Sequence, residues 1–328
     1  MHMRFRRLAA SVVLTTLAAG GAAFGQATTR PAVESSTDSA FVPAGYVKVF
    51  SDEMNRPQLD TNKWWTRYIY ENGTLASLND EKQLFSENDN HVMTGTALAL
   101  TARVHQDEKK PKYLYQSGMI RSKTTFKYGY FEARIKLPAA KGVWPAFWLN
   151  SDADKNGKVH WPPEVDIFEF VNNGKEDRVE MLHSGVVDRT KTGEKSYWEG
   201  GIIEADPKFK PRGSNRGGAY YAPFNFPDDY HIFAALWDTD DTFTILVDNK
   251  KIVKYRYKWM WPTGEDAPYA HVLLNLAIGG QWPGRHGIDD AAFPQAMTID
   301  YVRVYQKADK QLTGESTIGH DFLKPAQP

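Results

Sequence analysis

The feature that most limits the folds open to this chain is the two-residue period of its hydrophobic pattern. In Phe131–Leu137 every second residue is apolar, and the residues between are charged. Because side chains of a strand point alternately to its two faces, this pattern predicts strands with one buried and one solvated face. The same alternation recurs in Leu98–Val104 and Thr298–Tyr305, and the dipeptide Asp248-Asn249 is placed as a hairpin turn.

The overall pattern favours an all-β fold. No stretch after the first 25 residues carries a clean helical period over about twelve residues without Gly or Pro. Aromatic residues make up 13% of the chain and turn residues recur regularly, which favours a two-sheet antiparallel β-sandwich over alternating strands and helices. We place a single domain at residues 41–306 and a polar C-terminal tail at residues 307–328.

The first 25 residues are predicted to be a secretory signal peptide. Met1–Arg7 contains three arginines, Leu8–Ala23 is a run of apolar and small residues, and small residues at positions 23 and 25 suit cleavage before Gln26. An uncleaved anchor is disfavoured, since spanning a bilayer takes about 20 strongly apolar residues. Residues 26–40 are polar and patternless, which predicts a flexible segment. We therefore expect a secreted or periplasmic protein that is not held in a membrane.

Charge and cysteine content exclude several function classes. The 40 basic and 40 acidic residues balance, and loss of three leader arginines leaves 37 minus 40, a net charge of −3. No positive field would attract nucleic acid or an anionic membrane. The absence of cysteine excludes disulfides, a thiolate nucleophile, a cysteine zinc site and an acylated lipoprotein anchor. We expect a monomer stabilised by packing.

Three acidic residues close together are the most informative chemical feature. Glu164 and Asp166 are two positions apart, so on a strand they share a face. Glu169 has the opposite parity and would point into the core unless a β-bulge near Ile167 or Phe168 restores it to that face. Since burial of an unpaired carboxylate is very costly, we predict the bulge and three acids on one face.

Such a group of carboxylates suits acid–base chemistry. Three neighbouring carboxyl groups cannot all ionise easily, so one holds a proton near neutral pH while another is an anion. Glycosidic cleavage needs this division, with one acid protonating the leaving oxygen and one carboxylate acting at the anomeric carbon. Spacing alone leaves two alternatives open, a solvated acidic face and a calcium site.

The segment Glu164-Val-Asp-Ile-Phe-Glu169 resembles the E-x-D-x-x-E signature of glycoside hydrolase family 16 in its bulged form, typical of bacterial laminarinases and several galactan hydrolases. With four further segments the resemblance covers roughly residues 45–306 in order. The segments that resemble the strands before the signature and the closing strands are Tyr128–Pro138, Gly142–Leu149, Leu274–Gly284 and Met297–Tyr305.

The resemblance implies a concanavalin-like jelly roll whose open concave cleft cleaves β-linked polysaccharides internally with retention. By motif position Glu164 is the nucleophile, Glu169 the acid/base, and Asp166 the residue that tunes the nucleophile. Hydrolysis requires no cofactor. The expected polymer is β-1,3 or mixed β-1,3/1,4 glucan. The alternatives are a substituted bacterial exopolysaccharide, an algal galactan, transglycosylation, and a non-catalytic carbohydrate-binding jelly roll, against which both glutamates argue.

A glycan cleft also needs aromatic platforms and polar groups between them, because sugars present flat C–H faces and rings of hydroxyls. By motif position we predict that Trp144, Trp148 and Trp282 line the cleft. Trp161 directly precedes the acids and belongs either to the cleft or to the core.

The resemblance adds two polar residues and one ion site. Asn79, in an Asn-x-Glu segment with Glu81, is implied to reach a sugar on the nonreducing side, and His183 either faces the substrate or is structural. Asp300 lies where many family members hold calcium, and Glu53 is a second candidate ligand. Hard oxygen ligands suit structural Ca²⁺. A solvated pair of acids is the alternative.

Residues 187–227 form an insertion that is longer than a plain laminarinase pattern requires. Within it Lys208, Lys210, Arg212 and Arg216 lie close together with no acid among them. Such a cluster is usually a solvated loop. If the loop overhangs the cleft, its cations would meet a glycan that carries carboxylate, succinyl, pyruvyl or sulfate groups. Our hypothesis is that the insertion tunes substrate choice.

Overall fold

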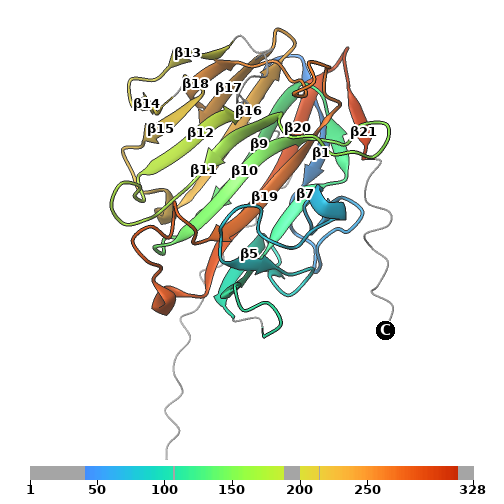
Figure 1. The fold of residues 1–328 in the computed structure, drawn as a ribbon. Helices are drawn as coiled ribbons and strands as arrows, with labels where there is room; N and C mark the ends of the chain where they lie inside the picture. The colour runs from blue at the N-terminus through green and yellow to red at the C-terminus, as the bar shows by residue number, and fades with distance from the viewer. Residues whose placement is uncertain (1–40, 106–107, 188–199, 214, 317–328) are drawn as a thin grey trace, which may run out of the picture. The chain divides into compact units, whose positions relative to one another are not determined.

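Two β-sheets carry most of the regular structure in the computed structural model (Figure 1). The structure describes residues 41–105, 108–187, 200–213 and 215–316, all within the unit Asp38–Pro328. The predicted signal peptide at residues 1–25 and flexible segment at residues 26–40 lie outside the described residues. Among the described residues, no helix has the length and apolarity needed to cross a membrane.

The first sheet has eleven strands, with β1 also paired to β20 and β4 to β5. In spatial order its main path is β13 (Gly201–Ala205), β18 (Lys250–Arg256), β17 (Thr242–Val247), β16 (Tyr230–Asp238), β9 (Gly129–Lys136), β20 (Gln295–Lys307), β5 (Leu98–Val104), β6 (Tyr115–Ser117) and β3 (Gln83–Phe85), and the two side strands are β1 (Tyr46–Asp52) and β4 (His91–Met93).

The second sheet has ten strands and lies in front of the first in Figure 1. Its order is β14 (Phe209–Pro211), β15 (Gly217–Tyr221), β12 (Met181–Val187), β11 (Glu164–Glu169), β10 (Val143–Ser151), β19 (Ala270–Ile278), β7 (Met119–Ser122) and β2 (Trp64–Trp65), with β8 (Thr124–Phe126) joining β19 to β21 (Thr313–Glu315). The helical segments described are the short 3-10 turns η1 (Tyr70–Asn72), η2 (Phe226–Asp228) and η3 (Asp290–Ala292).

The main hydrophobic core lies between these sheets. Phe168 of the second sheet packs on Phe233 of the first, with ring centroids 4.4 Å apart. On β9 the residues Phe131, Ala133 and Ile135 are fully buried, as their alternation predicts. The two-sheet antiparallel sandwich is therefore confirmed, and among the described strands only β3 and β6 pair in parallel.

Local features confirm the hairpin, move the C-terminal boundary of the domain and correct the facing of one residue. Asp248 and Asn249 have φ of 48° and 64°, which a two-residue turn between β17 and β18 requires. The domain extends past residue 306, because β21 lies within the predicted polar tail and pairs with β8. Glu132 does not face solvent as the alternation suggests. It is fully buried and accepts hydrogen bonds from Tyr130 and Tyr301.

Candidate active site

The predicted bulge is present in β11. Against β10, Phe168 pairs with Phe147 and Asp166 pairs with Trp148, so Ile167 is the extra residue. The register against β12 shifts over the same interval, between Asp166 and Glu169. One additional residue thus restores the parity of Glu169, and the alternation of the strand continues beyond it.

All three acids lie on the same face of β11. Glu164, Asp166 and Glu169 are each half-buried, whereas the residues between them are buried in the core. Burial raises the pKa of Glu164 and of Glu169, and the charge of Glu169 raises the pKa of Glu164 further. Burial and the two neighbouring charges raise the pKa of Asp166 well above its usual range. The group therefore keeps a proton at a pH where isolated carboxyl groups have lost theirs.

The two outer carboxylates each accept a hydrogen bond from a tryptophan indole. Trp144 Nε1 donates to Glu169 Oε1 at 3.1 Å, and Trp161 Nε1 donates to Glu164 Oε2 at 3.0 Å. Each bond favours the charged carboxylate and so opposes the effect of burial on its pKa. Trp161 is 41% exposed, which places it beside the acids rather than in the core.

Trp282 and His183 complete the Glu169 end of this face. The ring of Trp282 meets Trp144 edge-on, with centroids 5.3 Å apart and planes at 69°. The same ring lies 4.8 Å from the ring of His183, also edge-on. His183 is opposite Glu169 on the neighbouring strand β12. The predicted residues Trp144, Trp282 and His183 are therefore brought together beside Glu169.

Asn79 lies on a segment that contacts the loop of Trp282. Asn79 is exposed, and its side-chain amide donates to Glu81 Oε1 at 3.0 Å. The next residue, Asp80, accepts a hydrogen bond from the backbone of Gln281 at 2.8 Å. Gly280 has φ of 86°, and a Cβ there would lie 2.6 Å from Asp80 Oδ1, so the two segments can meet only at glycine.

Trp148 does not offer the platform predicted for it. It shares the face of β10 that carries Trp144, but it is only 5% exposed. Tyr68 packs on it with ring centroids 6.1 Å apart, and its indole donates to Asn275 at 2.8 Å. The segment around Tyr68 covers this part of the sheet, so Trp148 packs beneath that segment and does not meet solvent.

The two acids predicted to bind calcium do not fit that role. Glu53 is bound by two nitrogens of Arg303, at 3.0 and 2.6 Å. Asp300 forms an ion pair with Arg134. Each carboxylate is thus neutralised by its own arginine, and no group of three or more His, Asp or Glu suited to a metal occurs in the described part of the chain.

The insertion forms strands rather than a free loop. β13 extends the eleven-stranded sheet, and β14 and β15 extend the ten-stranded sheet, while residues 188–199 lie outside the described residues. Lys210 binds the carbonyl of Pro207, and Lys208 is held through its backbone by Asp206. Arg212 instead donates to Asp177 at 2.9 Å, which brings it next to His183.

Sequence reasoning missed Asp177 and Tyr70. Asp177 contacts Trp282 as well as Arg212, but it has no distinctive spacing from the three acids. The Tyr70 hydroxyl accepts a hydrogen bond from Asn150, which is opposite Glu164 on β10. Burial and the charge of Glu164 raise the pKa of Tyr70 well above its usual range. The sequence signal for Tyr70 was only an aromatic residue in a loop.

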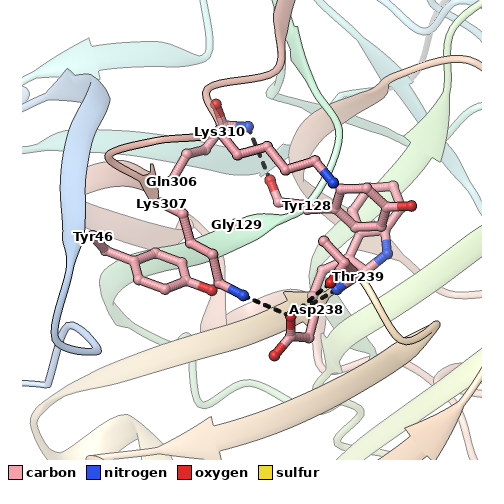
Figure 2. A pocket seen from close by; sticks show the side chains of 9 residues that line it. Tyr46, Tyr128, Gly129, Asp238, Thr239, Gln306, Lys307 and Lys310 are labelled. Carbon is pink, nitrogen blue, oxygen red and sulfur yellow. Dashed lines mark hydrogen bonds and ion pairs between the residues drawn. The ribbon is translucent and has the colours of Figure 1, made fainter.

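A hollow lies on the eleven-stranded sheet. Figure 2 shows its lining, which comes from β1, β9, β16, β20 and the segment after β20. Tyr46 and Tyr128 lie on either side of an ion pair between Lys307 and Asp238. None of the three acids of β11 lines it.

The bulged strand β11 carries three acids on one face of an antiparallel sandwich, and two of them accept hydrogen bonds from indoles. Such a group of acids is the arrangement expected of a glycoside hydrolase. Residues 46–307 match the family model described as "Beta-porphyranase A-D, GH16 domain". The chain belongs to glycoside hydrolase family 16.

Individual relatives agree with this assignment. The chain is 30% identical over 271 residues to a β-glucanase of Rhodothermus marinus, covering 79% of this chain and 84% of that protein. It is 28% identical over 291 residues to glucan endo-1,3-beta-glucosidase A1 of Niallia circulans, covering 83% of this chain but only 39% of that longer protein. The solved structure of SCLam, a non-specific endo-β-1,3(4)-glucanase, matches with a TM-score of 0.62 and 28% identity, over 81% of this chain and 93% of SCLam.

Proposed function

We propose that this protein is an endo-acting hydrolase of β-1,3 or mixed β-1,3/1,4 glucan that retains the anomeric configuration. The arrangement that carries the proposal is the bulge in β11, which sets Glu164 and Glu169 on one face, each with an indole donor. The choice of polymer rests on the β-glucanases and endo-1,3-glucanases among its relatives.

The proposed mechanism needs one protonated carboxyl group, on Glu169, and one charged carboxylate, on Glu164. Protonated Glu169 gives its proton to the leaving glycosidic oxygen while the Glu164 carboxylate bonds to the anomeric carbon. The Glu169 carboxylate then takes a proton from water, which attacks the anomeric carbon and releases Glu164. Burial raises the pKa of Glu164 to about 8 and of Glu169 to about 7, which keeps protons within the group near neutral pH. The assignment of the transferred proton to Glu169 and of the attacking carboxylate to Glu164 follows their positions in the family signature. Asp166 lies between them on the strand, and the charges of both glutamates raise its pKa.

A second candidate substrate is an algal galactan. Two observations favour it, the description of the matching family model as that of β-porphyranases and the presence of a cation, Arg212, next to His183 and Trp282. The chemistry is unchanged in this alternative, because the same two glutamates act on a β-linked galactose unit.

A panel of purified polysaccharides tests the proposal. We expect new reducing ends and a ladder of short oligosaccharides from laminarin and lichenan, with little release from agarose and porphyran. The reverse pattern would assign the galactan. Glu164→Gln should abolish turnover, and NMR of the first products should show the β-anomer. A Glu164→Gln variant that binds and turns over glycan like the parent would contradict the catalytic role.

We also propose that the protein acts outside the cytoplasm, as a monomer, on a β-linked polysaccharide. The support is the arginine-rich, apolar and alanine-rich leader in the sequence. Expression in a bacterial host, followed by N-terminal sequencing of the periplasmic and culture-medium fractions, should give a mature chain that starts at Gln26. Recovery of the intact chain in membranes would contradict cleavage.

A further inference from the structure

A single buried carboxylate joins the side chains at the Glu169 end of the site. Asp177, in the connection between β11 and β12, is 2% exposed. Its Oδ2 accepts hydrogen bonds from Trp282 Nε1 and Asn173 Nδ2, both at 2.8 Å. Its Oδ1 lies 2.9 Å from both Arg212 Nη1 and His183 Nε2. Four side chains therefore converge on one carboxylate.

The contacts of Asp177 keep it charged and fixed. Burial raises its pKa, but His183, Trp282 and Arg212 together hold the pKa of Asp177 well below its usual range. The connection itself is fixed by Asn173, whose Oδ1 accepts from the backbone N–H of Asp177 at 3.1 Å and of Lys175 at 3.0 Å. The Asp177 carboxylate is thus charged and held in one position.

Three of its partners lie on three different segments, and two of these are distant in the sequence. His183 lies on β12, Arg212 follows β14 in the insertion, and Trp282 belongs to the loop after β19. Neighbouring strands are joined by backbone hydrogen bonds, whereas these three segments meet here through side-chain contacts with Asp177. Loss of the carboxylate would leave the Trp282 and Asn173 donors without an acceptor, which is costly where the donor is buried.

The path from this carboxylate to the acid/base residue is short. Asp177 holds the indole of Trp282, whose ring packs edge-on against Trp144, and the Trp144 indole donates to Glu169. His183, the second ring against Trp282, is opposite Glu169 across the β11–β12 pair. An altered orientation of Trp282 would therefore change both the surface that meets the sugar and the donor to Glu169.

We propose that Asp177 is a positioning residue for the glycan site, because it fixes Trp282, His183 and Arg212 in one arrangement and through Trp282 keeps Trp144 bonded to Glu169. This inference rests on the proposed function, in which Glu169 protonates the leaving oxygen. It assigns the connection between β11 and β12, and not only the strand itself, to the catalytic machinery.

The alternative is that Asp177 serves stability alone, and the chain offers a matched control for it. Asp52 is 4% exposed and accepts a hydrogen bond from the Trp64 indole at 2.8 Å and from the backbone of Met54 at 3.1 Å. It is therefore a second buried aspartate that holds a tryptophan. Trp64 lies on β2, which β10, β19 and β7 separate from β11, and Asp52 lies on β1 of the other sheet.

The kinetic test compares Asp177→Asn, Trp282→Phe, the double variant and Asp52→Asn on the polysaccharide that the parent cleaves best. Small misplacements at an active site cost up to about 100-fold, so we expect Asp177→Asn to lower kcat/KM by about 10- to 100-fold, with KM raised. Asp52→Asn should lose thermal stability but keep both constants within about twofold of the parent when folded, as distant sites do not couple. The double variant should be no worse than the poorer single variant by more than about twofold, because both changes break one path.

A substrate-free measurement separates this inference from the proposed function. In ¹H–¹⁵N spectra, Asp177→Asn should shift the indole N–H signals of both Trp282 and Trp144, and Asp52→Asn should shift that of Trp64. A parent that cleaves no glycan would refute the proposed function, while the spectra would still decide the positioning role. An unmoved Trp144 signal, or kinetic constants of Asp177→Asn that match those of Asp52→Asn, would overturn the inference.

Discussion

Replacing Glu169 with Gln should lower activity strongly yet stabilise the fold above neutral pH. Burial raises the pKa of Glu169 from 4.5 to about 7, so the folded state binds this proton more tightly than the unfolded chain does. Stability then falls as pH rises from the unfolded pKa to the folded pKa, because the unfolded state gains from ionisation first. Gln keeps the shape and the acceptor for Trp144 without the charge.

The size of the effect follows from the pKa. A rise of about 2.5 in pKa corresponds to about 3 kcal/mol of lost stability once the pH exceeds 7. Glu169 is only half-buried, and solvent screens part of this, so we expect Glu169→Gln to gain about 1–3 kcal/mol at pH 8. In a domain of this size that raises Tm by roughly 2–8 °C. The gain should vanish near pH 4, where both states are protonated.

Thermal unfolding followed by circular dichroism from pH 4 to pH 9 measures this difference. The exposed Glu265, changed to Gln, serves as the baseline for the loss of one surface carboxylate. Activity of Glu169→Gln should fall by about 10²–10⁴-fold, the usual contribution of a general acid. A stability difference that is independent of pH, or a variant less stable than the parent at pH 8, would refute the electrostatic reasoning.

Three further outcomes are expected. Trp144→Phe removes the donor that favours charged Glu169, so the pKa of Glu169 should rise. The alkaline limb of the pH profile of kcat/KM should then move to higher pH by up to about one unit, and an unmoved limb would show that the indole does not tune this acid. Trp148→Ala should lower the free energy of unfolding in urea titrations by about 3–5 kcal/mol, because it leaves a cavity at a buried site. A loss below about 1 kcal/mol would indicate that Trp148 is an exposed sugar platform after all. Chelation with EDTA should leave Tm unchanged, since arginines already neutralise Glu53 and Asp300, and a fall of several degrees would reveal a structural ion.

The strands were predictable because their signal is local. Alternation in Leu98–Val104 coincides with β5, and Asp248-Asn249 forms the turn between β17 and β18. Parity also predicted the bulge in β11, since only an extra residue could keep Glu169 out of the core. In each case a short segment carried enough information on the direction of its side chains.

Features that depend on distant partners were not predictable. Trp148 has the same facing as Trp144, and only the segment that contains Tyr68 decides that one is covered. Glu132 alternates as a solvated residue, but Tyr301 from another strand buries it. Asp177 gains its role from contacts with three separate segments, which no spacing within its own segment could reveal.

The placement of the insertion has a consequence for engineering. Without β13, β14 and β15, the strands β18 and β12 would become sheet edges. Exposed edges offer unpaired N–H and C=O groups to other chains and promote aggregation. Grafting a shorter loop to alter substrate preference would therefore also remove the protection of both edges, and such a chimera should be soluble only if charged residues or proline are placed along the newly uncovered strands.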